Sequence, residues 1–180
     1  MLAVQSRTLL YSKEFLFTIM IGSYFLWCAW DPYQWHLIDG ANLLIHEAGH
    51  VLFMPFGEYL MIAGGSLLQV MMPALFVFYF YRNKKVYSAA LVMLWVGESI
   101  LNVSVYAGDS IKMQLPLLGG QDSVHDWNYL LDRAGLLAAT SKIEVLIRLG
   151  GTLVILGGLY FAFKSALNSN GSNKPQDQSA

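Results

Sequence analysis

The stretch LLIHEAGHVLF, residues 43–53, places two histidines and a glutamate inside an otherwise apolar run. Ionisable side chains are costly in an apolar interior, so three of them close together indicate a functional role. His46 and His50 are four residues apart, and side chains at positions i and i+4 lie on the same face of a helix. Both imidazoles can therefore reach one ion if this stretch is helical.

The composition of the whole chain agrees with this apolar stretch. Of its 180 residues, 56% are hydrophobic and 13% are charged, which is about half the charged share of an average soluble domain. The net charge is -1, and no basic patch indicates a nucleic-acid partner. The single cysteine, Cys28, excludes an intrachain disulfide and a cysteine zinc cluster. The composition predicts a membrane protein.

Apolar runs of about 20 residues predict helices that are long enough to cross a bilayer. Four runs reach or approach this length, at residues 15–30, 59–81, 86–108 and 150–163. Residues 41–56 form a fifth apolar helix, which either spans the membrane or enters the protein interior. The predicted fold is all-α, a polytopic membrane helix bundle of four to five helices without a cleaved signal peptide.

One membrane-embedded metallopeptidase-like domain is predicted over residues 1–167. Residues 168–180, NSNGSNKPQDQSA, are polar and low in complexity, so they are predicted to form a disordered tail. We expect an integral, multi-pass membrane protein. The expected membrane is the bacterial cytoplasmic membrane. The expected partners are membrane lipid and a membrane-protein or peptide substrate, whereas orientation and oligomeric state do not follow from the sequence.

The pattern His46-Glu47-Ala48-Gly49-His50 has the residue types and the spacing of a zinc site. Imidazole is a common zinc ligand, and catalytic zinc sites combine three protein ligands with one open position. Glu47 follows the first histidine, where it can take a proton from the attacking water and pass it to a leaving amine. Chance matches to this pattern lie mostly on solvated helices, whereas apolar residues flank this one. A purely structural cluster of polar groups is the alternative.

A membrane-embedded HExGH helix followed by further membrane helices resembles the site-2-protease-like intramembrane zinc metallopeptidases. The stretch IHEAGHVLF, residues 45–53, carries the resemblance. It implies zinc as the cofactor, His46 and His50 as metal ligands, Glu47 as the catalytic base, and an aspartate from a later helix as third ligand. The implied function is hydrolysis of peptide bonds in or next to the membrane. A non-proteolytic metal-binding membrane protein, such as a transporter or sensor, would use the same histidines.

The third ligand is where the chain departs from this family. The family's aspartate lies in a Leu-Asp-Gly-like or Asn-Pro-Asp-Gly-like stretch after the histidines, whereas LIDG at residues 37–40 lies before them here. Asp39 is seven residues before His46, which is about 10 Å along a continuous helix. Asp39 is therefore predicted to lie near the helix N-terminus, where a negative charge is favoured, and not to bind the ion.

Four later residues are candidates for the third ligand: Asp109, His125, Asp126 and Glu98. Asp109 is predicted first, because an aspartate near the end of a later helix matches the family best. His125 and Asp126 come next, in a long loop that could fold back over the site. As alternatives to metal binding, Asp109 is an ordinary interfacial acid and the HDW stretch at 125–127 is an anchor at the lipid headgroups.

Gly64-Gly65 and Gln69 form a second feature, in the apolar run 59–81. Small residues allow helices to approach closely, and Gln69 can bond across helices. The glycine pair is predicted to mark a helix contact, with a flexible gate for an extended substrate as the alternative. If Glu98 is not a ligand, it is predicted to be a buried acid that bonds to Gln69 or Asn102.

Overall fold

The structure, a computed structural model, describes residues 13–116, 118 and 124–172, and among them every regular element is helical. The elements of this part of the chain are α2 (Lys13–Trp30), α3 (Leu37–Phe53), η1 (Met54–Phe56), α4 (Glu58–Arg82), α5 (Val86–Gly108), α6 (Asp126–Arg133), η2 (Leu137–Ala139) and α7 (Thr140–Ser172). The prediction of an all-α fold is confirmed.

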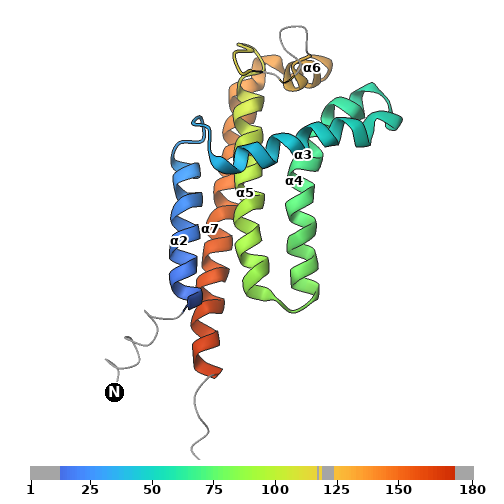
Figure 1. The fold of residues 1–180 in the computed structure, drawn as a ribbon. Helices are drawn as coiled ribbons and strands as arrows, with labels where there is room; N and C mark the ends of the chain where they lie inside the picture. Colours follow the sequence, from blue (N-terminus) through green and yellow to red (C-terminus); the bar gives the residue numbers. More distant parts are fainter. Residues whose placement is uncertain (1–12, 117, 119–123, 173–180) are drawn as a thin grey trace, which may run out of the picture.

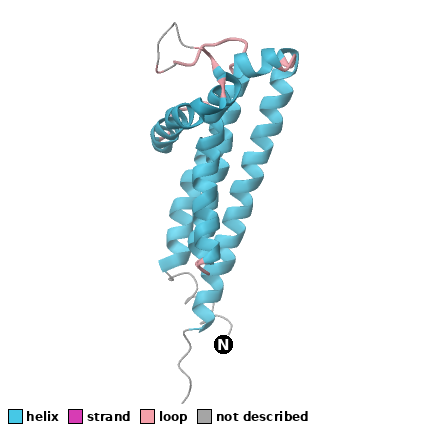
Figure 2. Ribbon diagram, turned by 90° about the vertical axis from the view of Figure 1, so that its right-hand side faces the viewer, coloured by secondary structure: helices cyan, strands magenta, loops and turns pink. Residues whose placement is uncertain are grey.

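The long helices α2, α4, α5 and α7 run side by side, and α3 lies across them (Figure 1). The view turned by 90° shows the same alignment of the long helices (Figure 2). α3 packs against α4 and also touches α5, whereas the short α6 contacts both α4 and α5. α6 lies at the end of the bundle opposite to the start of α2 (Figure 1). The crossing helix α3 therefore brings its histidines to two of the upright helices.

Three helical segments among the described residues are long and apolar enough to cross a membrane: α4, α5 and Leu137–Asn168. They make the chain a plausible membrane protein, but the expected count of four to five membrane helices is not matched. α2 has 18 residues and begins with Lys13 and Glu14. α3 has 17 residues and carries acidic groups and two histidines along its length. Both fall short of the roughly 20 predominantly apolar residues that a crossing needs.

The predicted runs differ from the helices mainly at their ends. The run 86–108 coincides with α5, and the run 59–81 lies within α4. Residues 41–56 are divided between α3 and η1, because Pro55 lies in η1 and Gly57 ends it with a φ of 94°. α7 begins before the run 150–163 and continues to Ser172, so its end overlaps the predicted disordered tail. Residues 173–180 of that tail lie outside the described residues.

The apolar core joins α2, α5 and α7. Its fully or nearly buried members are Phe25, Leu94, Leu101, Ile155 and Leu159. Close approach of α5 and α7 depends on small residues, since a Cβ on Gly151 would lie 2.7 Å from the carbonyl oxygen of Gly97. The core thus fixes the position of α5, against which the crossing helix α3 packs.

The contact between α3 and α4 depends on Gly49, Gly64 and Gly65. A Cβ added to Gly49 would lie 2.2 Å from the backbone oxygen of Gly64, and one on Gly65 would lie 2.5 Å from Nε2 of His46. Backbone atoms cannot rotate away as a side chain can. The predicted helix contact at Gly64-Gly65 is confirmed, and it places the His46 ring directly against α4.

Gly49→Ala is expected to destabilise the protein by about 1–3 kcal/mol, because the new methyl group overpacks a backbone contact. Gly40→Ala in the same helix is the matched control, since a Cβ there meets nothing within 4 Å. The control is expected to stabilise by roughly 0.5–1 kcal/mol through the lower flexibility of alanine. Thermal unfolding of both variants in detergent measures the difference. Equal shifts in the same direction would show that the α3–α4 contact is not close.

Candidate metal centre

Two histidines of α3 and one aspartate of α6 meet at the bundle end. His46 and His50 lie one turn apart, with ring centroids separated by 4.8 Å. Nε2 of His46 lies 2.9 Å from Oδ2 of Asp126, and Nε2 of His50 lies 3.2 Å from the same oxygen. The ligand atoms of the three residues all lie within 4.8 Å of one another, so the group could hold a metal ion.

The spacing of these atoms fits a small divalent ion. Ligands at 2.0–2.2 Å from a tetrahedral ion are about 3.3–3.5 Å apart. The two nitrogen–oxygen distances of 2.9 and 3.2 Å are slightly shorter, as expected where hydrogen bonds join the ligands instead of an ion. Two imidazoles and one carboxylate would leave a fourth position open.

The other ring nitrogen of each histidine faces a hydrogen-bond acceptor. Nδ1 of His50 lies 2.9 Å from the backbone oxygen of Met61, and Nδ1 of His46 lies 3.1 Å from Oε1 of Gln69. Amide and peptide oxygens only accept hydrogen bonds, so each Nδ1 carries a hydrogen, in addition to the one that each Nε2 shares with Asp126 while no ion is bound. Both Nε2 atoms are thereby left as the nitrogens that can bind an ion, which is the usual arrangement of metal-binding histidines.

The carboxylate between the two rings is held in its charged form. The hydrogen bond to Asp126 raises the pKa of His50 to about 9, against the effect of burial. Burial raises the pKa of Asp126, but the hydrogen bonds from His46 and His50 outweigh it, and the net direction is downward. An ionised carboxylate is the form that binds metals.

Glu47 lies at the edge of this group. It is half-buried and directly follows His46, and its charge is one of those that raise the pKa of His50. The side chain of His50 is 24% exposed, against 8% for His46 and Asp126. The group is therefore most accessible to solvent beside His50.

Asp109, the predicted third ligand, does not belong to the group of three. Its Oδ1 accepts from the backbone N–H of Gln114 at 3.0 Å, and its Oδ2 accepts from that of Leu115 at 2.8 Å. Nε2 of His125 lies 3.4 Å from Oδ2 of Asp109. The structure instead places Asp126, one of the two next candidates, with the histidines.

His125 connects Asp109 to the group of His46, His50 and Asp126, which we call the metal group. It is the N-cap of α6, and its Nδ1 accepts from the backbone N–H of Asn128 at 3.2 Å. The hydrogen of the ring must then be on Nε2, which faces Asp109. Asp109 thus orients the N-cap of α6, and the first residue of that helix is Asp126.

Asp109→Asn is expected to weaken metal binding by about 10–100-fold, as for other partners that orient a ligand indirectly. The neutral amide is a poorer acceptor for His125, so α6 and Asp126 are held less firmly. Competition between the purified protein and a chelator for Zn²⁺ measures the affinity, with Asp132→Asn, an exposed aspartate of α6, as control. Unchanged affinity would contradict the orienting role, and complete loss would make Asp109 a direct ligand.

Glu98 lies away from the histidines. It is 2% exposed, and it accepts from Nδ2 of Asn42 at 2.7 Å. Asn42 also accepts from Trp95 and Ser99 of α5. The predicted buried acid is therefore present, but its partners are Asn42 and Asp39 of α3 and not Gln69 or Asn102, because α3 lies across the face of α5 that carries Glu98.

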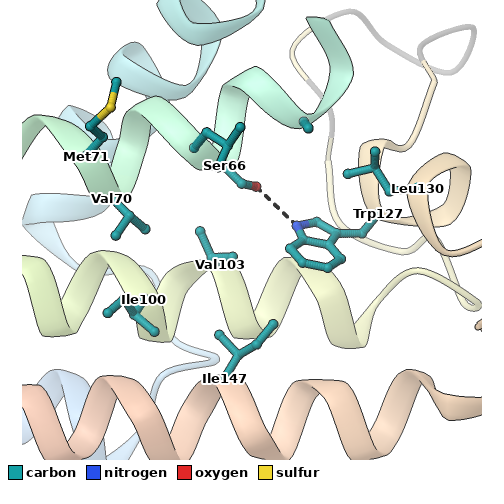
Figure 3. A pocket seen from close by; sticks show the side chains of 10 residues that line it. Ser66, Val70, Met71, Ile100, Val103, Trp127, Leu130 and Ile147 are labelled. Atoms are coloured by element: carbon teal, nitrogen blue, oxygen red, sulfur yellow. Dashed lines mark hydrogen bonds between the residues drawn. The ribbon is translucent and has the colours of Figure 1, made fainter. Parts of the chain in front are cut away.

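An apolar groove of about 480 Å³ lies between α4, α5, α6 and α7 (Figure 3). Nε1 of Trp127 donates to Oγ of Ser66 at 3.1 Å at one end of it. Val70, Ile100 and Ile147 are among its walls. Trp127 thus packs α6 against α4. The residues that line the groove do not include the metal group.

Comparisons of the chain with protein-family models, with curated proteins and with solved structures find no match. The resemblance to site-2-protease-like metallopeptidases stays a prediction that rests on IHEAGHVLF. Two contacts of the histidines were not predicted, the carbonyl of Met61 and the side chain of Gln69. Gln69 was recognised only as a group able to bond across helices, because its partner depends on how α3 crosses α4.

Proposed function

We propose that this chain is a multi-pass, integral-membrane zinc metalloprotease, of the site-2-protease-like kind and of the bacterial cytoplasmic membrane. It would hydrolyse peptide bonds of a membrane protein or peptide in or next to the membrane. One observation carries the proposal: Nε2 of His46 and Nε2 of His50 both face Oδ2 of Asp126, while both Nδ1 atoms are bonded to acceptors.

In this proposal His46, His50 and Asp126 hold the zinc ion, and the HEAGH sequence supplies Glu47 beside it. The bound ion supplies Lewis-acid chemistry, which polarises a carbonyl and makes water more acidic. Glu47 takes the proton of the attacking water and gives it to the leaving amine. Its half-buried position next to the accessible side of the group supports this role.

The substrate segment has to be unwound where it is cut. Amides within a membrane helix are bonded to one another, so a carbonyl is available only where that bonding is broken. A substrate with a helix-breaking residue near the bundle end that carries α6 fits this requirement best.

A non-proteolytic metal-binding protein, such as a sensor or transporter, is the second candidate. The three side chains themselves favour it, since two histidines and one aspartate could hold a metal ion whether or not the protein cleaves peptides. Such a protein would need His46, His50 and Asp126 but not the acid-base function of Glu47.

One experiment on the purified protein separates the two candidates. Zinc content and cleavage of a mixture of detergent-solubilised membrane-segment peptides are measured on the same sample, with new N-termini identified by mass spectrometry. The protease requires both bound zinc and cleavage that depends on Glu47. Bound zinc with cleavage that does not depend on Glu47, or with none, supports the second candidate.

A further inference from the structure

A chain of three hydrogen bonds links the metal group to the beginning of α3. It runs from Nδ1 of His46 to Oε1 of Gln69 at 3.1 Å, and from Nε2 of Gln69 to Oδ1 of Asn102 at 2.7 Å. The last bond runs from Nδ2 of Asn102 to Oδ1 of Asp39 at 3.0 Å. We call Gln69, Asn102 and Asp39 the amide relay. It leaves α3, crosses α4 and α5, and returns to α3 two turns earlier.

Asp39 determines which way the side-chain amides of the amide relay are turned. Oδ2 of Asp39 accepts from the backbone N–H of His36 at 2.6 Å, so the carboxylate is held at the start of its own helix. A carboxylate has acceptors only, so Asn102 must turn its NH₂ group towards Asp39 and its oxygen towards Gln69. Gln69 then turns its NH₂ group to Asn102 and its oxygen to His46. The reverse orientation would place the oxygen of Asn102 against the oxygen of Asp39.

The consequence for His46 is a defined tautomer. Because Gln69 presents an oxygen, Nδ1 of His46 carries a hydrogen whether or not an ion is bound. Nε2 also carries one here, in its hydrogen bond to Asp126, and it is the nitrogen whose lone pair becomes available when an ion displaces that hydrogen. Nε2 is the atom that faces Asp126. Only this tautomer can bind an ion between His46, His50 and Asp126.

Burial makes the relay hard to rearrange. Asp39 is 4% exposed and Gln69 is 2% exposed, so water cannot easily reach them to replace a lost hydrogen-bond partner. A buried polar group without a partner costs about 1–3 kcal/mol. The orientation of both amides is therefore held by the same bonds that satisfy them.

We propose that Gln69, Asn102 and Asp39 are positioning residues, which set the tautomer of His46 so that Nε2 is free to bind a metal ion. Asp39 lies too far along α3 to be a ligand, yet it determines how a ligand is presented. This inference rests on the proposed metal site.

Substitutions at Gln69 test the hydrogen bond separately from packing. Gln69→Met has a similar length but no acceptor, so it is expected to bind Zn²⁺ about 10–100-fold more weakly than wild type. Gln69→Glu keeps an oxygen towards Nδ1 of His46 and is expected to restore binding to near the wild-type value. Ser99→Ala is the control, because Ser99 is buried and bonds to Asn42 outside the relay.

Asp39→Asn tests whether Asp39 sets the orientation of the Asn102 and Gln69 side-chain amides. An amide can present either an oxygen or an NH₂ group to Asn102, so both orientations of the relay become possible. If they are equally populated, half of the molecules carry the wrong tautomer and the apparent affinity for Zn²⁺ falls about twofold. A larger fall means that the wrong orientation predominates.

Zinc affinity of all five proteins is measured by competition with a chelator in detergent, after circular dichroism has shown that each is folded. The expected order is wild type, Ser99→Ala and Gln69→Glu together, then Asp39→Asn, and Gln69→Met last. Failure of wild type to bind Zn²⁺ overturns the proposed metal site and this inference with it. If wild type binds, a Gln69→Met affinity equal to wild type, or a Gln69→Glu affinity as low as that of Gln69→Met, overturns the relay alone.

Discussion

Replacing Glu47 by glutamine is expected to leave zinc bound and to lower peptide cleavage by about 10²–10⁴-fold. Glutamine has nearly the same shape but cannot take up a proton, so the attacking water loses its base and the leaving amine loses its acid. The metal group itself is made by His46, His50 and Asp126. Its affinity for zinc should therefore change little.

The measurement compares cleavage of the same membrane-segment peptides by zinc-loaded wild-type and Glu47→Gln protein. Glu58→Gln is the matched control, since Glu58 is an exposed acid in α4 that pairs with Arg133. It is expected to cleave like wild type. Wild-type cleavage by Glu47→Gln would contradict the protease and leave the metal-binding sensor or transporter as the better proposal.

Replacing His46 by alanine is expected to remove nearly all bound metal, from about one zinc per chain in wild type. Two ligands remain in that variant, and His50 and Asp126 alone make an under-coordinated site. Asp126→Ala should have a similarly severe effect, well beyond the roughly 10–100-fold of a residue that only orients a ligand. Ser99→Ala is the control, since Ser99 is buried and bonds to Asn42 outside the group.

The zinc content of the purified proteins is measured by metal analysis, after growth with zinc and a wash with a weak chelator. This measurement tests whether His46 and Asp126 are needed to hold the ion. A zinc content near zero in wild type would contradict both proposed functions. Full zinc in Asp126→Ala together with loss in Asp109→Ala would identify Asp109 as the third ligand. In that case α6 would have to occupy a different position when the ion is bound.

Local sequence patterns predicted the five long helices and two of the three metal-group residues, but not α6, which lies within the predicted long loop. The apolar run 86–108 matches α5 because its ends are marked by basic residues on one side and Asp109 on the other. His46 and His50 share a face because the spacing of four residues is a property of any helix. Each of these features depends on neighbours in the sequence alone.

The features that the sequence did not predict depend on how distant helices meet. Asp126 was ranked behind Asp109 because nothing local determines where a helix after a long loop will dock. The sequence feature that could have indicated Asp126 is the short helix DWNYLLDR, of which it is the first residue. Trp127 of this helix donates to Ser66 on α4. The predicted number of membrane helices was larger than the three that the described residues contain. One reason is the apolar run 41–56, which resembles a short membrane span in the sequence. In the structure most of it belongs to α3, which lies across the bundle (Figure 1).

The separation of the metal-group residues along the chain has a consequence for synthesis. His46 and Asp126 are 80 residues apart, and α4 and α5 lie between them. A growing chain has its two histidines long before residue 126 has left the ribosome, and α4 and α5 must be inserted before α6 can dock. The group of three can therefore be completed only late in biosynthesis. A partly made chain that ends before residue 126 would lack one of the three side chains that could hold a metal ion.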